Sequence, residues 1–199
     1  FIYLPEVAFD QDAFLRDLEK AFEKNCNLIV CVSEGIHDAD GTFICEYDSS
    51  VGTDTFGHKM LAGCGKYLEN LVRSRLGVKA RSVELNVSQR CSAALISATD
   101  QQEAIAAGKF GVQAALDGET GKMVSFVRQT DTAGTYQRVC GLQDVNSICH
   151  EEKTVPVEWI TPDGHDVTED FIHYARPLIQ GNISVPLGED GLPEFVYRK

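Results

Sequence analysis

A glutamate and an arginine each stand at the end of a segment that the sequence predicts to be a strand. Glu34 follows the apolar run 30–32 and precedes a glycine, and Arg90 closes the segment 81–90. In open α/β sheets, ligands bind at the carboxyl ends of the strands. A carboxylate there accepts hydrogen bonds from the hydroxyls of a polyol or sugar, whereas a guanidinium is a planar partner for phosphate. A plain loop position, at which the glycine merely turns the chain, explains Glu34 equally well.

A second arginine, Arg81, lies nine residues before Arg90. At about 3.3 Å per residue, an extended strand would separate the two side chains by up to roughly 30 Å. One chain could not then place both on the same small ligand. Arg81 is therefore either an ordinary surface residue or a residue that acts in the site of another subunit.

The elements that must position these side chains alternate along the chain. Apolar patterning predicts helices over residues 10–24, 59–76, 99–116 and 168–176, and strands over 28–32, 79–87, 122–128 and 136–142. Asp10, Thr99 and Thr168 stand at N-cap positions, and Gly77 ends the second helix. The run 28–32 is continuously apolar, as in a strand covered on both faces. This order predicts an α/β layered domain with a mainly parallel sheet.

Composition and charge exclude several classes of protein. The 199 residues are 43% hydrophobic and 24% charged, which is ordinary for a globular domain, and no apolar run is long enough to span a membrane. The net charge of −12 disfavours nucleic acid and anionic lipid as partners but leaves room for one basic pocket. Seven cysteines without a CxxC pair favour a reducing, cytoplasmic compartment. The chain starts at Phe1 without Met or a visible signal peptide, so we expect a segment of a longer protein.

Several motifs, taken in order and spacing, resemble the C-terminal half of the phosphofructokinase family. They are the segments 3–6 (YLPE), 32–35 (VSEG), 81–90 with its final Gln89-Arg90, and 166–181 (DVTEDFIHYARPLIQG). The variant at 88–91 (SQRC), together with 155–160 (VPVEWI), resembles the bacterial pyrophosphate-dependent branch. The resemblance implies a three-layer fold with helices on both faces of the sheet. It assigns residues 1–182 to the fructose 6-phosphate-binding half and 183–199 to a C-terminal tail.

The resemblance also implies roles for individual residues. Glu34 would hold hydroxyls of fructose 6-phosphate, and Arg90, with Gln89 beside it, would bind the 6-phosphate. Arg81 would reach into the site of the neighbouring subunit, which implies a homodimer or homotetramer. The ATP-dependent members have a phosphate-binding histidine three residues before the arginine, whereas Val87 stands here and cannot donate to phosphate.

The family's donor loops and its Thr-Ile-Asp catalytic motif precede the Pro-Glu segment and do not occur in these 199 residues. Phosphoryl transfer needs a positioned donor and a metal ion. We therefore expect the donor (pyrophosphate rather than ATP), Mg²⁺ and the general base to be held outside this chain, which alone would be inactive. One alternative is a non-catalytic module that binds a sugar phosphate or regulates a partner. Another is an unrelated α/β domain whose charged strand ends are incidental.

Overall fold

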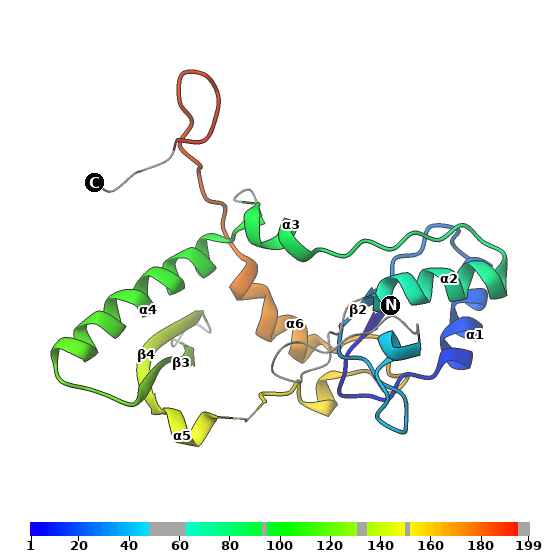
Figure 1. Cartoon of the computed structure of the whole chain (residues 1–199), viewed down its shortest axis with the longest axis horizontal. Helices are drawn as coiled ribbons and strands as arrows, with labels where there is room; N and C mark the ends of the chain where they lie inside the picture. The colour runs from blue at the N-terminus through cyan, green and yellow to red at the C-terminus, as the bar shows by residue number, and fades with distance from the viewer. Residues whose placement is uncertain (48–62, 93–94, 131–134, 150–151, 195–199) are drawn as a thin grey trace. The chain divides into compact units, whose positions relative to one another are not determined.

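The computed structural model describes residues 1–47, 63–92, 95–130, 135–149 and 152–194 (Figure 1). The chain divides into two compact units, each made of two segments. Unit 1 comprises Phe1–Leu85 and Thr154–Phe171, and unit 2 comprises Asn86–Lys153 and Ile172–Lys199. Each unit is described by itself.

Unit 1 contains a short parallel sheet. Strand β1 (Ile2–Tyr3) pairs with β2 (Cys31–Val32), in the register Ile2↔Cys31 and Tyr3↔Val32. The strand expected over 28–32 is confirmed at its last two residues, whereas the expectation that both of its faces are covered is wrong. Only its last two residues pair, and exposure alternates along the run, so that Ile29 is 80% exposed while Val30 and Val32 are half-buried. One face packs on the core and the other is open, which is the pattern of a strand at a half-covered sheet.

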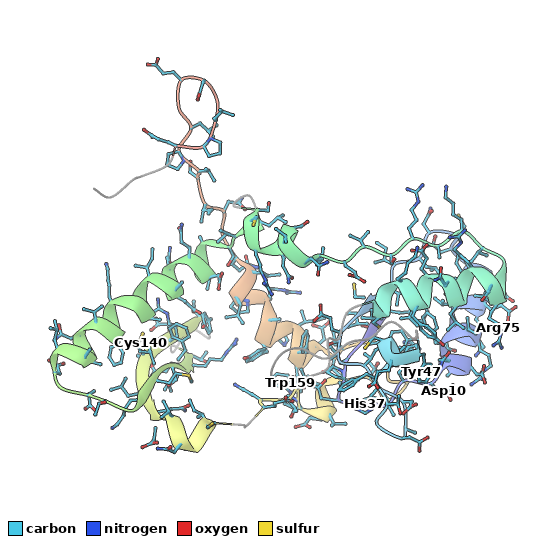
Figure 2. The ribbon with its side chains drawn as sticks, viewed as in Figure 1. Asp10, His37, Tyr47, Arg75, Cys140 and Trp159 are labelled. Atoms are coloured by element: carbon cyan, nitrogen blue, oxygen red, sulfur yellow. The ribbon has the colours of Figure 1, made fainter. Side chains whose placement is uncertain are left out.

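Two helices cover the core of unit 1. The N-cap of α1 (Gln11–Phe22) is Asp10, whose carboxylate accepts from the Asp12 and Ala13 N–H groups at 2.8 and 2.9 Å. Helix α2 (Cys64–Leu76) ends at Gly77, which has a φ of 67°. Both caps were predicted and are confirmed; residues 59–62 of the second predicted helix lie outside the described residues. At the surface, Arg75 of α2, which Figure 2 labels, forms an ion pair with Asp12 at 3.6 Å.

The core of unit 1 is built from α1, α2, the segment that precedes α1 and the segment between the two helices. Its buried members are Tyr3, Phe9, Phe14, Leu15, Leu18, Ile36, Ile44, Cys45, Cys64, Leu68 and Val72. A 3-10 turn, η1 (Ile44–Tyr47), adds two of them. Hydrogen bonds and contacts of the His165 ring join the segment 154–171, which contains the 3-10 turn η3 (Val157–Trp159), to the rest of this unit. The Val155 N–H donates to Glu6 Oε1 at 2.7 Å, and the Ile2 N–H donates to the His165 carbonyl at 2.8 Å.

The predicted strand over 79–87 is also wrong. Residues 77–85 follow α2 without regular structure, and a short helix, α3 (Asn86–Cys91), takes up the rest of the segment. A strand needs a hydrogen-bonded neighbour to be stable, and the described part of the chain offers none to this segment. Its apolar side chains are exposed to solvent; Val83, for example, is 81% exposed.

Unit 2 packs one long helix beside a hairpin (Figure 1). Strands β3 (Lys122–Thr130) and β4 (Tyr136–Asp144) pair antiparallel over their whole length, which confirms the two predicted strands. Helix α5 (Val145–Ile148) follows the hairpin. The N-cap of helix α4 (Ala98–Leu116) is Ser97, two residues before the predicted cap, Thr99. Ser97 has an extended backbone, and its hydroxyl accepts from the Asp100 N–H at 3.0 Å.

The segment 166–181 ends in α6 (Glu169–Ala175) and the 3-10 turn η4 (Arg176–Ile179). The end of this segment fastens the start of α4. The Ser97 hydroxyl donates to the Leu178 carbonyl at 2.6 Å, and the Ala98 N–H donates to the Gly181 carbonyl at 3.1 Å. Gly181 has a φ of 77°, and a Cβ there would lie 2.7 Å from that of Ala98, so this position requires glycine.

Candidate functional site

Glu34 lies in the turn that follows β2, as the sequence predicts, and its side chain is exposed. The Ser33 N–H donates to the Tyr3 carbonyl at 3.1 Å, which ties the start of the turn to β1. A Cβ on Gly35 would lie 3.6 Å from that of Pro5, so the chain passes close to the segment 3–6 here. The carboxylate is therefore presented to solvent on a backbone that is fixed on its N-terminal side.

The segment after Glu34 is fixed as well. Ile36 is fully buried, and the Ile36 and His37 carbonyls accept from the N–H groups of Ile44 and Phe9 at 3.0 and 2.7 Å. The Asp38 carboxylate accepts from the Tyr47 hydroxyl and from the Thr42 N–H. These hydrogen bonds, that of Tyr47 foremost, lower the pKa of Asp38. Figure 2 shows His37 and Tyr47 in this part of unit 1.

A buried thiol lies within the electrostatic reach of Glu34. Burial, with additions from Cys45, Glu84 and Glu34, raises the pKa of Cys64 to about 12. Cys64 therefore stays a neutral thiol at physiological pH and serves the core as a small apolar side chain. The carboxylate of Glu34, by contrast, is exposed to solvent.

Arg81 lines a basic pocket of about 580 Å³ at the end of α2. Three cations line it, Arg73, Lys79 and Arg81, together with Glu69 and residues of the segment 77–80. Within the described ranges, neither Lys79 nor Arg81 forms an ion pair or side-chain hydrogen bond. In a protein with a net charge of −12, this is a local concentration of positive charge.

Glu69 shapes the wall of this basic pocket. Its carboxylate, which is 9% exposed, accepts from the Ser82 N–H at 2.9 Å, the Ser82 hydroxyl at 2.7 Å and Lys66 Nζ at 2.8 Å. The hydrogen bonds from Lys66 and Ser82 lower the pKa of Glu69 to about 2. Its negative charge is thus matched by Lys66 and by Arg73, whose Nη1 lies 3.4 Å from the same carboxylate. Lys79 and Arg81 form no such pair among the described residues.

The sequence interpretation did not find Glu69, Arg73 or Lys79. The sequence could have indicated that Lys79 lies beside Arg81, because residues two apart in an extended segment point to the same side. The signal for Glu69 is weaker, since its partner Ser82 lies 13 residues away.

Gln89 and Arg90 lie on α3 and are exposed. The expectation that Arg90 ends a strand is wrong, for the reason given for the segment 79–87. Arg90 occupies the last turn of this short helix, where a cation is favoured. Glu34 and Arg81 belong to unit 1, and Gln89 and Arg90 to unit 2. Within unit 1, no hydrogen bond or ion pair among the described residues joins Glu34 to Arg81.

The described residues do not fit a metal ion, because they contain no group of three or more His, Cys, Asp or Glu that could hold one. We therefore derive no step through a metal on this chain. Among the same residues, no helix is long and apolar enough to cross a membrane. All seven cysteines are free thiols.

Comparison with known proteins finds relatives along nearly the whole chain. The chain is 36% identical over 195 residues to the pyrophosphate–fructose 6-phosphate 1-phosphotransferase of Methylococcus capsulatus, covering 98% of this chain and 45% of that protein. It is 36% identical over 198 residues to the enzyme of the same name from Xanthomonas campestris, covering 100% of this chain and 46% of that protein. No family model matches the chain. The chain thus spans less than half the length of these curated relatives, and the match falls on their C-terminal half.

Solved structures give the same result for the fold. The crystal structure of a pyrophosphate-dependent phosphofructokinase from Nitrosospira multiformis matches with a TM-score of 0.77 and 29% identity, over 98% of this chain and 44% of that chain. This likeness confirms the predicted α/β fold class. The parallel pair β1–β2 and the antiparallel pair β3–β4 are the paired strands within the described residues.

Proposed function

Since the chain belongs over its whole length to the phosphofructokinase family, we propose that it is the fructose 6-phosphate-recognition part of a pyrophosphate-dependent 6-phosphofructokinase. The observation that carries this proposal is the match, at 36% identity over 195 residues, to the C-terminal half of an enzyme named for that reaction. Residues 1–182 form the recognition part, and 183–199 form the tail.

In this proposal, four side chains contact different parts of the sugar phosphate. Arg90, with Gln89 beside it, binds the 6-phosphate, and the exposed carboxylate of Glu34 accepts hydrogen bonds from the sugar hydroxyls. Arg81 acts in the site of a partner subunit within a homodimer or homotetramer. The role of Arg81 is supported by the family resemblance and by its place in the basic pocket.

The reaction would transfer a phosphoryl group from pyrophosphate to the 1-hydroxyl of fructose 6-phosphate. Catalysis of this kind depends on positioning and on neutralising charge. This chain positions the acceptor sugar, while the donor, Mg²⁺ and the general base are held by residues outside it. Seven free thiols favour a reducing compartment, so we place the reaction in the cytoplasm.

A ligand panel tests this proposal on the chain as it stands. Calorimetric titration should give saturable binding of fructose 6-phosphate, weaker binding of glucose 6-phosphate, and binding of fructose below detection. With Mg²⁺ and either pyrophosphate or ATP, the chain alone should form no fructose 1,6-bisphosphate. Turnover by the chain alone would show that the general base lies within it. Equal affinity for all sugar phosphates would favour the alternative of a general sugar-phosphate-binding module.

A further inference from the structure

Unit 2 contains a pocket of its own, which the proposed function does not use. Its volume is about 380 Å³. It is lined by Arg128 and Thr130 of β3, Tyr136 of β4, His173 of α6, and Arg176 and Pro177 of η4. The hairpin supplies one wall, since Thr130 and Tyr136 are partners in the β3–β4 ladder, and the end of the segment 166–181 supplies the other. We call it the hairpin pocket.

Arg128 is held rigidly in the wall of the hairpin pocket. Its guanidinium donates to the Tyr174 and His173 carbonyls at 2.9 and 3.3 Å, and so fastens β3 to the end of α6. The same group lies over the rings of Tyr136 and Tyr174, at 4.6 and 4.7 Å from their centroids. Carbonyls and aromatic faces are neutral, so they orient a guanidinium and leave its positive charge in place. Arg128 is therefore a fixed cation.

The carboxylate of Glu103, which contacts Tyr136 of the lining, is paired with other groups. Glu103 accepts from the Tyr136 hydroxyl at 2.6 Å and lies 3.6 Å from Arg138 Nε, and it is not one of the residues that line the pocket. Burial and the bond to Glu103 raise the pKa of Tyr136 to about 12. Tyr136 therefore remains a neutral aromatic wall.

The second arginine of the lining is Arg176. Arg176 is exposed, and neither its guanidinium nor the His173 ring forms a hydrogen bond or ion pair within the described ranges. The described residues of the lining thus include two guanidinium groups, an imidazole and a threonine, and no carboxylate. Two guanidinium groups beside one small cavity match the several oxygens of a tetrahedral oxyanion.

We propose that the hairpin pocket binds a phosphate group, as free phosphate or as part of a small phosphorylated metabolite, at a site separate from Glu34, Arg81, Gln89 and Arg90. Arg176 and Arg128 bind its oxygens, and His173 and Thr130 supply further donors. A ligand there would bridge the hairpin and η4, and it would stabilise unit 2 increasingly as its concentration rises above the Kd.

The test uses the Arg90→Ala chain, in which the proposed sugar 6-phosphate contact is removed. It is titrated with inorganic phosphate, pyrophosphate and fructose 6-phosphate at constant ionic strength, and amide resonances are followed by NMR. We expect shifts at Arg128, Tyr136 and His173. Adding Arg176→Gln should weaken binding by about 10–100-fold, the loss expected for one charge-assisted contact. The tightest of the three ligands identifies the source of the phosphate group.

Two further variants decide the outcome. Arg75→Gln removes an exposed arginine of unit 1 and should leave the affinity unchanged. His173→Gln should weaken binding several-fold, and it replaces Arg176→Gln as the deciding variant if that chain does not fold. Unchanged affinity in Arg176→Gln and His173→Gln would overturn the proposal. So would an equal loss in Arg75→Gln, because the binding would then follow overall charge and not this pocket.

Discussion

Ser82 donates two hydrogen bonds to Glu69, from its N–H at 2.9 Å and from its hydroxyl at 2.7 Å. Ser82 directly follows Arg81, so these bonds fix the backbone of the arginine to the middle of α2. Gly65 lies on the same side, where a Cβ would be 3.4 Å from that of Ser82. Arg81 is therefore carried on an irregular segment that a helix holds in place.

We expect Glu69→Gln to lower the stability of the fold at neutral pH and to flatten its dependence on pH in acid. The pKa of Glu69 is lowered from 4.5 to about 2 in the folded chain. Its stabilising contribution is thus present above the unfolded value and is lost as the pH falls from about 4.5 towards 2. Thermal unfolding followed by circular dichroism from pH 7 to pH 2 measures this. Glu19→Gln, on the exposed side of α1, is the control, and superimposable wild-type and Glu69→Gln curves would contradict the role of Glu69.

We expect truncation of a leucine in the core of unit 1 to cost far more stability than truncation of an exposed leucine. Leu18 is 3% exposed, and truncating it leaves a cavity, so Leu18→Ala should cost about 2–5 kcal/mol of unfolding free energy. Leu116 is 77% exposed, and Leu116→Ala should change the stability by less than about 0.5 kcal/mol. Urea titration gives both values. Equal effects would mean that the core described for unit 1 is incorrect.

Local signals in the sequence predicted some elements correctly. The cap at Asp10, the stop at Gly77 and the hairpin strands depend on neighbouring residues, and each is confirmed. The strand over 79–87 was predicted from alternating apolar residues, but strands form only against a neighbour, which local pattern does not supply. The cap at Thr99 failed because Ser97 lies in the extended conformation that a cap requires.

The candidate site was predictable to different degrees. Glu34 was found because a strand, a carboxylate and a glycine are adjacent in the sequence. The basic pocket was not found, because Glu69 and Ser82 approach each other only after α2 turns back at Gly77. The hairpin pocket combines β3 with α6, whose contact through Arg128 spans 46 residues.

Mixing two variants tests whether Arg81 acts between subunits. Arg81→Ala and Arg90→Ala chains should each bind fructose 6-phosphate weakly. In a two-fold dimer of the two, one site carries both lesions and the other carries neither. After subunit exchange, confirmed by native mass spectrometry, calorimetry should show that a fraction of tight sites returns. If exchange occurs and no tight sites return, Arg81 does not act in the site of its partner.

Glu34→Gln should weaken fructose 6-phosphate binding by about 10-fold while leaving the fold intact. The amide keeps one acceptor oxygen but loses the charge that strengthens its bonds to hydroxyls. The side chain is exposed, so the thermal midpoint should not move. Asp40→Asn, in the exposed turn that follows, is the matched control. A lowered midpoint with normal affinity would make Glu34 a structural residue of the turn.

The affinity of the chain for fructose 6-phosphate, compared between wild type, Arg90→Ala and Arg90→Lys, tests the central claim most directly. Loss of a charge-assisted phosphate contact costs about 1.5–3 kcal/mol, so Arg90→Ala should weaken binding by about 10–100-fold. Arg90→Lys keeps the charge and should lose less. Arg90 is exposed on α3, so the fold should be retained in both variants. Calorimetric isotherms for Arg90→Ala that match those of the wild type would remove Arg90 from the site and contradict the proposed sugar-phosphate recognition.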